Sequence, residues 1–204
     1  MNTNLKIFID RQFWTNTYVL TKNGEAIIID PSFNDSKIEE YLKQSDCKLA
    51  GIILTHAHYD HIGNTFSLAR EHHVKVYVHQ NEQPIVTKYH FAKELGKQAN
   101  IDLNLIEYFK GDQLKVQDFK FDILLTPGHT PGGVCLKYSN DVFTGDTLFF
   151  DSVGRTDLPL GNSEQLMQSL KQILLTYKDD NHIYPGHGTN GLLKDIKLSN
   201  QWLQ

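Results

Sequence analysis

The chain has 204 residues, of which 40% are hydrophobic and 22% are charged, and its formal net charge at pH 7 is −4. This length and apolar content predict a single domain over residues 1–204 that is large enough to bury a hydrophobic core. The slightly acidic balance, without blocks of like charge, argues against nucleic acid as a partner. Because we find neither a signal peptide nor an apolar run of membrane-spanning length, we expect a cytoplasmic protein that does not bind membranes.

The first half of the chain is predicted to form strands covered by helices. Asn23-Gly24 is a strong signal for a tight turn between strands, so the chain is expected to open as an antiparallel meander. Ser36 and Glu39 have the spacing of a capping box, and Pro84 fits the first turn of a later helix. In chain order, we predict strands over residues 5–9, 17–21 and 26–30, a helix from Ser36, a strand over 52–54, a helix over 65–72, a strand over 75–78, a helix from 81 to about 95, and a loop over 96–104.

The second half is predicted to have a similar order of elements. Ser163 is expected to cap a helix whose leucine and isoleucine side chains recur at helical spacing. Residues 53–58 also resemble residues 124–129, since each is an apolar strand that runs into a histidine loop, and this suggests a duplicated half. In chain order, we predict strands over 113–116, 119–125, 134–138 and 142–144, a helix from Ser163, a strand over 182–184 and a last helix from about Leu192.

Residues 55–61 read Thr-His-Ala-His-Tyr-Asp-His and directly follow the apolar run that ends at Leu54. In an extended segment alternate side chains share a face, so His56, His58 and Asp60 are expected to point the same way. His61, where a helix is expected to start, should turn elsewhere. One loop could therefore provide ligands to two metal centres.

Three further polar residues, His129, Asp146 and His187, lie at the ends of predicted strands beside glycine or proline. Small neighbours let the backbone approach a site closely. Ligands that are only imidazole and carboxylate suit zinc first, and also iron or manganese. The two cysteines, Cys47 and Cys135, are predicted to be reduced structural thiols. The remaining histidines are expected at the surface or in packing: His72, His73, His79, His90 and His182.

With these motifs the chain resembles the metallo-β-lactamase-fold hydrolases, and among them the short glyoxalase II-like branch of the hydroxyacylglutathione hydrolases. The resemblance spans residues 30–188 and implies an α/β fold, the αββα sandwich, with a binuclear site at one edge of its sheets. It also implies that Asp146 bridges two divalent ions. The ligands it implies are His56, His58 and His129 for one ion and Asp60, His61 and His187 for the other.

The resemblance is closer to glyoxalase II than to exported zinc β-lactamases, whose main type uses a cysteine ligand. Full-length relatives carry a C-terminal helical domain that helps to hold glutathione, whereas this chain ends at Gln204, so we expect no such separate domain. The loop after Asp146 is implied to bind substrate through Phe149 and Arg155. A guanidinium can grip a carboxylate, although Arg155 could instead pair with Asp157 and shape the loop.

The expected activity is hydrolysis of a thioester of a small thiol to a carboxylic acid and the free thiol. Two ions about 3.5–4 Å apart would lower the pKa of a bridging water to about 7, so a bridging hydroxide is the expected nucleophile, with Asp60 and Asp146 as catalytic carboxylates. A thiol with a pKa of about 8.5 can leave without a strong general acid.

Other activities are compatible with the same residues. A lactone or another ester could be the substrate. A single iron held by His56, His129 and Asp146 could support persulfide dioxygenation, because persulfide dioxygenases share the Gly-Arg-Thr-Asp segment at 154–157. A phosphodiesterase or nuclease would use similar chemistry, but the sequence shows no basic stripe that would bind a phosphate backbone. A non-enzymatic metabolite binder is disfavoured because it would not need a complete set of metal ligands.

Overall fold

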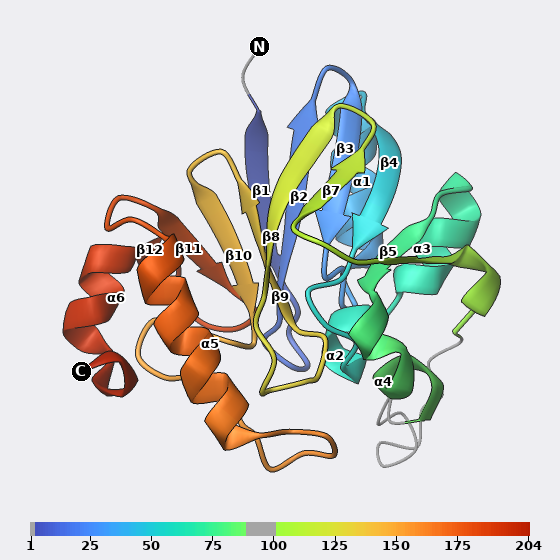
Figure 1. Cartoon of the computed structure of the whole chain (residues 1–204). Coiled ribbons are helices and arrows are strands. Elements are labelled where there is room, and N and C mark those ends of the chain that lie inside the picture. The colour runs from blue at the N-terminus through green and yellow to red at the C-terminus, as the bar shows by residue number, and fades with distance from the viewer. Residues whose placement is uncertain (1–2, 89–100) are drawn as a thin grey trace.

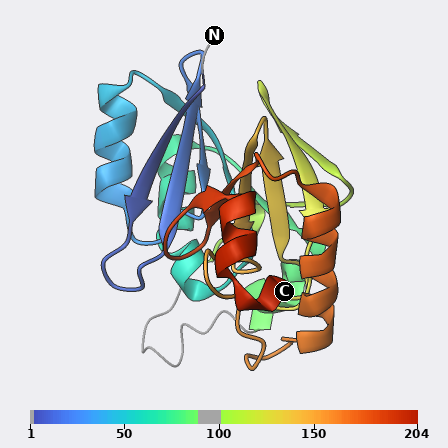
Figure 2. The ribbon, with the colours of Figure 1, turned by 90° about the vertical axis from the view of Figure 1, so that its left-hand side faces the viewer.

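The computed structural model describes residues 3–88 and 101–204. Two six-stranded sheets pack face to face, and helices cover the outer side of each sheet, as the two views at right angles show (Figure 1; Figure 2). The layers therefore run helix, sheet, sheet, helix, and the predicted αββα sandwich of the α/β class is confirmed. No helix in the described part of the chain is long and apolar enough to cross a bilayer.

The first sheet contains the six strands of the N-terminal half in sequential order. Its first three strands form the predicted antiparallel meander, with Asn23 and Gly24 at positive φ in the turn, and the next three pair in parallel. The elements of this half are β1 (Asn4–Ile9), β2 (Asn16–Lys22), β3 (Glu25–Ile29), α1 (Asp35–Gln44), β4 (Lys48–Ile53), α2 (Tyr59–Ile62), α3 (Thr65–His72), β5 (Val76–His79), η1 (Gln80–Glu82), α4 (Gln83–Lys88), η2 (Leu103–Leu105) and β6 (Ile106–Phe109).

The second sheet has the order β12-β11-β10-β9-β8-β7. Strands β7 to β10 are antiparallel, β11 pairs in parallel with β10, and β12 closes the outer edge. The elements of this half are β7 (Gln113–Val116), β8 (Phe119–Leu125), β9 (Val134–Tyr138), β10 (Asp141–Gly145), α5 (Ser163–Thr176), β11 (His182–Pro185), β12 (Gly191–Leu192), α6 (Leu193–Ser199) and η3 (Gln201–Leu203).

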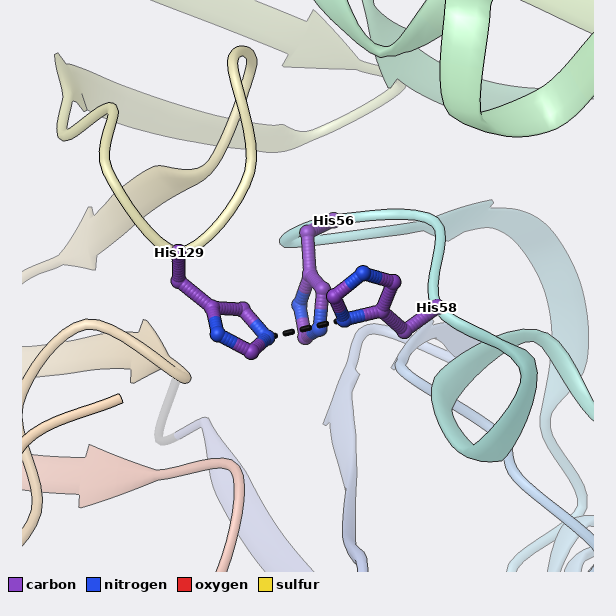
Figure 3. Close-up of side chains that lie close together, drawn as sticks. All are labelled: His56, His58 and His129. Atoms are coloured by element: carbon purple, nitrogen blue, oxygen red, sulfur yellow. Dashed lines mark hydrogen bonds between the residues drawn. The ribbon is translucent and has the colours of Figure 1, made fainter. Parts of the chain in front are cut away.

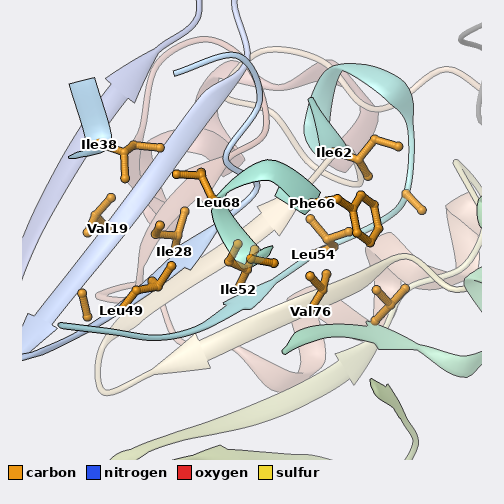
Figure 4. Close-up of a cluster of buried hydrophobic side chains, with 14 of the residues drawn as sticks. Val19, Ile28, Ile38, Leu49, Ile52, Leu54, Ile62, Phe66, Leu68 and Val76 are labelled. Carbon is orange, nitrogen blue, oxygen red and sulfur yellow. The ribbon is translucent and has the colours of Figure 1, made fainter. Parts of the chain in front are cut away.

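The apolar side chains of β3 are buried on both of its faces. Ile28 points to the core beneath the helices of the first half (Figure 4), whereas Ile27 and Ile29 point to the core between the two sheets. Successive side chains of a strand alternate in direction, so a strand covered on both sides needs a continuous apolar run. The same alternation occurs in β4, the strand whose end carries the first histidine motif.

Two helix starts differ from the prediction. Helix α1 begins at Asp35 after Asn34, and no side chain caps it, so the capping box predicted at Ser36 is wrong. Helix α5 is capped by Asn162, whose side-chain oxygen accepts the N–H of Gln165 at 3.0 Å, one residue before the predicted cap. Asn and Ser are almost equally good caps. Asn162 takes the cap position because its backbone is extended.

The segment after β5 also differs from the prediction. A 3₁₀ turn, η1, precedes α4, and Pro84 lies in the first turn of α4 as predicted. The remainder of the predicted helix, 89–95, lies outside the described residues. Residues 96–100 of the predicted loop also lie outside the described residues, and η2 begins in its described part. The short strands β6 and β12 were not predicted. Both are edge strands that depend on a neighbour for their hydrogen bonds.

Candidate metal centre

Four strand ends bring the predicted ligands together. The loop after β4 carries the first histidine motif, the loop after β8 carries His129, Asp146 follows β10 directly, and His187 follows β11. In both sheets these ends lie at the same edge. Loops on rigid strands position side chains well, and open α/β sheets commonly bind ligands at this edge. The predicted strand-end position of the motifs is confirmed.

The first cluster consists of His56, His58 and His129, all buried, with candidate ligand nitrogens within 4.8 Å of one another. Nδ1 of His58 lies 2.8 Å from Nε2 of His129, and Figure 3 shows the three rings converging from two loops. Nε2 of His56 is buried and has no hydrogen-bond partner among the described residues. A buried polar atom normally has a partner, so this ligand set fits a metal cation.

The second cluster consists of Asp60, His61 and His187, whose ligand atoms also lie within 4.8 Å. Nε2 of His187 is 3.1 Å from Oδ2 of Asp60, and Nε2 of His61 is 3.5 Å from the same oxygen. The prediction that Asp60 continues the extended segment of His56 and His58 is wrong, because Asp60 and His61 both lie in α2, and this helical turn brings both side chains to the second cluster. A carboxylate with two imidazoles is a donor set that suits zinc or iron.

Asp146 lies between the two clusters. Its Oδ1 is 3.3 Å from Nε2 of His61, and its Oδ2 is 3.5 Å from Nε2 of both His129 and His187. Gly186 lies directly behind it, since a Cβ there would come 2.1 Å from Oδ1. The carboxylate therefore faces both clusters, an arrangement that suits a bridging ligand.

The second nitrogen of several rings is held by an acceptor. His61 donates from Nδ1 to Oδ2 of Asp30 at 2.9 Å, His129 donates to the carbonyl of Arg155 at 2.7 Å, and His187 donates to the carbonyl of Trp14 at 3.2 Å. Asp30 is buried and also accepts the N–H and the hydroxyl of Thr55. Such contacts fix ring orientation and leave Nε2 for a metal. The sequence predicts Asp30 only as the last residue of a strand, and the proline that follows it gives no signal of this contact.

The imidazoles of the two clusters differ in pKa. Burial lowers the pKa of His56 well below its usual value and that of His58 to about 3, so both rings are neutral at pH 7. Burial also lowers the pKa of His187, but its contacts with Asp146 and Asp60 outweigh this and raise it to about 9. Despite burial, His61 and the other histidine contacts hold the pKa of Asp146 well below its ordinary range.

A cavity of about 700 Å³ opens on both clusters. Phe149 lines it and lies edge-on to the His187 ring, with centroids 6.0 Å apart. Arg155 also lines it, but its guanidinium is exposed and makes two 2.7 Å contacts with the Asp157 carboxylate. The pairing considered from the sequence is thus present, and substrate contact by Phe149 and Arg155 stays a prediction. Much of the wall is apolar: Phe13, Phe149, Phe150, Val153 and Leu158.

The other described histidines lie outside the two clusters. His72 contacts Glu39 at 2.6 Å, His73 ends α3 in the left-handed region, and His182 contacts Asn190 at 2.8 Å. His79 is buried and accepts the N–H of Asn81. These four positions agree with the expected surface or packing roles. His90 lies outside the described residues.

The chain belongs to the Metallo-beta-lactamase superfamily, whose sequence model matches residues 12–187. It is 37% identical to a probable metallo-hydrolase of Streptococcus pyogenes, over 91% of this chain and 84% of that one. It is 36% identical to the hydroxyacylglutathione hydrolase GloC of Haemophilus influenzae, over 87% of each chain. The crystal structure of the BLEG-1 B3 metallo-beta-lactamase is similar with a TM-score of 0.90 and 28% identity, over 98% of this chain and 100% of that one. The chain is therefore a metallo-hydrolase of this superfamily.

Proposed function

We propose that this protein hydrolyses a thioester of a small thiol and uses two divalent metal ions, zinc in the first instance. The observation that carries the proposal is the position of Asp146, whose carboxylate faces both adjoining clusters of ligand side chains beside one cavity. The first ion would be held by His56, His58 and His129, the second by Asp60, His61 and His187, and Asp146 would contact both.

When bound, a pair of such ions lowers the pKa of water and stabilises negative charge on a carbonyl oxygen. The chain's own groups then decide how substrate and protons are held. Asp60 lines the cavity, and Thr15 donates a hydroxyl hydrogen bond to its Oδ2 at 3.2 Å. We assign to this oriented, partly exposed carboxylate the role of accepting the proton of the attacking water. Asp146, which is more deeply placed, fixes the spacing of the two clusters.

The cavity wall favours a substrate with an apolar portion. Phe149 and Phe150 offer large apolar surfaces, and burial of such surface contributes roughly 25 cal/mol per Å². Arg155 at the rim gives one site for a carboxylate, in competition with Asp157. A thioester fits this setting because a thiolate leaves with little protonation, whereas an amine leaving group needs a positioned acid.

The first test combines metal content with turnover. Purified protein is assayed for zinc, iron and manganese, and for cleavage of S-lactoylglutathione, of a medium-chain acyl thioester of an uncharged thiol, and of a β-lactam. We expect about two zinc ions per chain and thioester cleavage that is lost in His56→Ala and kept in His72→Ala. One iron per chain with oxygen uptake on glutathione persulfide, or cleavage of the β-lactam alone, would overturn the proposal.

A further inference from the structure

Glu82 is a buried carboxylate outside both candidate clusters. Its side chain is fully shielded from solvent, with 0% exposure, and it lies at the end of η1, directly after β5. The preceding His79 caps this turn, because its Nδ1 accepts the N–H of Asn81 at 3.3 Å. The position of Glu82 is therefore set by the first sheet. A fully buried acidic side chain is rare unless it is paired.

The two oxygens of Glu82 bind two different loops. Oε2 accepts the N–H of Ala57 at 2.8 Å, and Oε1 accepts the N–H of Gly132 at 2.7 Å. Ala57 lies between His56 and His58 in the loop after β4, whereas Gly132 lies three residues after His129 in the loop after β8. One side chain thus connects the ligand loops of the two halves of the sandwich.

Gly132 is shaped for this contact. A Cβ at this position would lie 2.6 Å from the backbone nitrogen of Glu82 and 2.9 Å from its Cγ. Only glycine lets the second loop approach η1 so closely. Burial raises the pKa of Glu82, and the Thr130 hydroxyl and the N–H donors of Ala57 and Gly132 partly offset this. Two separate acceptors could satisfy the N–H groups of Ala57 and Gly132. A single carboxylate that accepts from both also fixes the distance between the two ligand loops.

We propose that Glu82 is a positioning residue for the first metal site, which sets His56 and His58 against His129 across the two halves. The inference rests on the proposed metal site. All three histidines belong to one cluster, and the second cluster is held by other contacts, among them the bond from His61 to Asp30. Loss of Glu82 should therefore weaken the first site selectively.

The test uses Glu82→Gln, which preserves the shape of the side chain and one acceptor oxygen but places an amide NH₂ against the other backbone N–H. Its matched control is Glu39→Gln, the same change at a partly exposed carboxylate on α1 that contacts His72. Metal-free proteins are titrated with zinc against a chromophoric chelator. We expect a loss of roughly 10–100-fold in affinity at one of two sites in Glu82→Gln, the range for outer-shell partners, and no change in Glu39→Gln.

A double-mutant cycle assigns the weakened site. In a His187→Ala background, which leaves the first cluster complete, Glu82→Gln should still lower zinc affinity; in a His129→Ala background it should not. Melting of the metal-free proteins is the second readout. A lower melting temperature with unchanged zinc affinity, or an equal loss at both sites, would reduce Glu82 to a structural residue and overturn the inference. Failure of the unmutated protein to bind zinc would instead overturn the proposed metal site itself.

Discussion

At the scale of single residues, the site depends on groups such as Asp30 that do not line its cavity. Asp30 accepts three hydrogen bonds, from the backbone and hydroxyl of Thr55 and from Nδ1 of His61. It is 1% exposed, and its φ of 49° places it in the left-handed region. A non-glycine residue there is strained, so the surrounding hydrogen bonds must hold it. This carboxylate therefore fixes both the loop that leaves β4 and the ring of a candidate ligand.

Asp30→Asn should weaken the second metal site. The amide nitrogen can accept no hydrogen bond, so either the Thr55 N–H at Oδ1 or both the Thr55 hydroxyl and Nδ1 of His61 at Oδ2 lose their acceptor, and the negative charge beside His61 is lost. We expect zinc affinity at that site to fall by roughly 10–100-fold, measured by titration against a chelator. The control is Asp179→Asn, a change at an exposed carboxylate that pairs with Lys197. Equal zinc binding by the two variants would contradict this role of Asp30.

The two cysteines should differ in reactivity. Both are unpaired, as predicted, but Cys135 is fully buried whereas Cys47 is partly exposed. Burial raises the pKa of Cys135 to about 12, so its reactive thiolate is almost absent at pH 8. Iodoacetamide at pH 8 should therefore alkylate Cys47 in the native protein, and both residues only in denaturant. Mass spectrometry of the peptides checks this, and rapid native labelling of Cys135 would contradict its full burial in β9.

At the scale of elements, the strands were predictable where their side chains alternate between two apolar cores, as in β3 and β4. The strand ends were predictable for the same reason, since polar ligands follow the apolar runs directly. Strand β12 was not predictable, because two residues carry no period and its pairing with β11 is purely tertiary. The contact of Asp30 with His61 was also hidden, since the two residues are 31 positions apart and a neighbouring proline suggests only a turn.

The loop after β11 offers a matched pair of glycines. In Gly186→Ala the new Cβ would meet Oδ1 of Asp146 at 2.1 Å and Cε1 of His61 at 2.7 Å, whereas at Gly188 nothing lies within 4 Å. We expect Gly186→Ala to lose metal and most activity. Gly188→Ala, at a φ of 76°, should cost only about 1–2 kcal/mol of stability. Metal analysis and thermal melts separate the two effects.

If Gly186→Ala kept its full metal content, the expectation that a Cβ at this position displaces the Asp146 carboxylate would be wrong. Loss of metal in Gly188→Ala would show instead that the whole loop, rather than the space behind the carboxylate, controls the site.

At the scale of the molecule, the two halves meet through contacts that need no metal. Tyr18 of the first sheet packs on Phe143 of the second, with ring centroids 5.0 Å apart. Asn16 donates from its side chain to the carbonyls of Pro185 and Gly188. The inner core draws on both sheets and combines aromatic with aliphatic side chains. The sandwich should therefore persist without metal.

Zinc should consequently raise the melting temperature of a protein that is already folded. A ligand that binds only the native state at about 1,000 times its Kd stabilises it by about 4 kcal/mol. For a chain of this size 1 kcal/mol corresponds to roughly 2–4 °C, so filling one site should raise Tm by about 8–16 °C. Far-UV circular dichroism of the chelated protein should stay native at 25 °C. His56→Ala combined with His187→Ala should abolish the zinc-dependent shift and keep the native spectrum. An unfolded metal-free chain would show instead that the metal ions, and not the inner core, join the two halves.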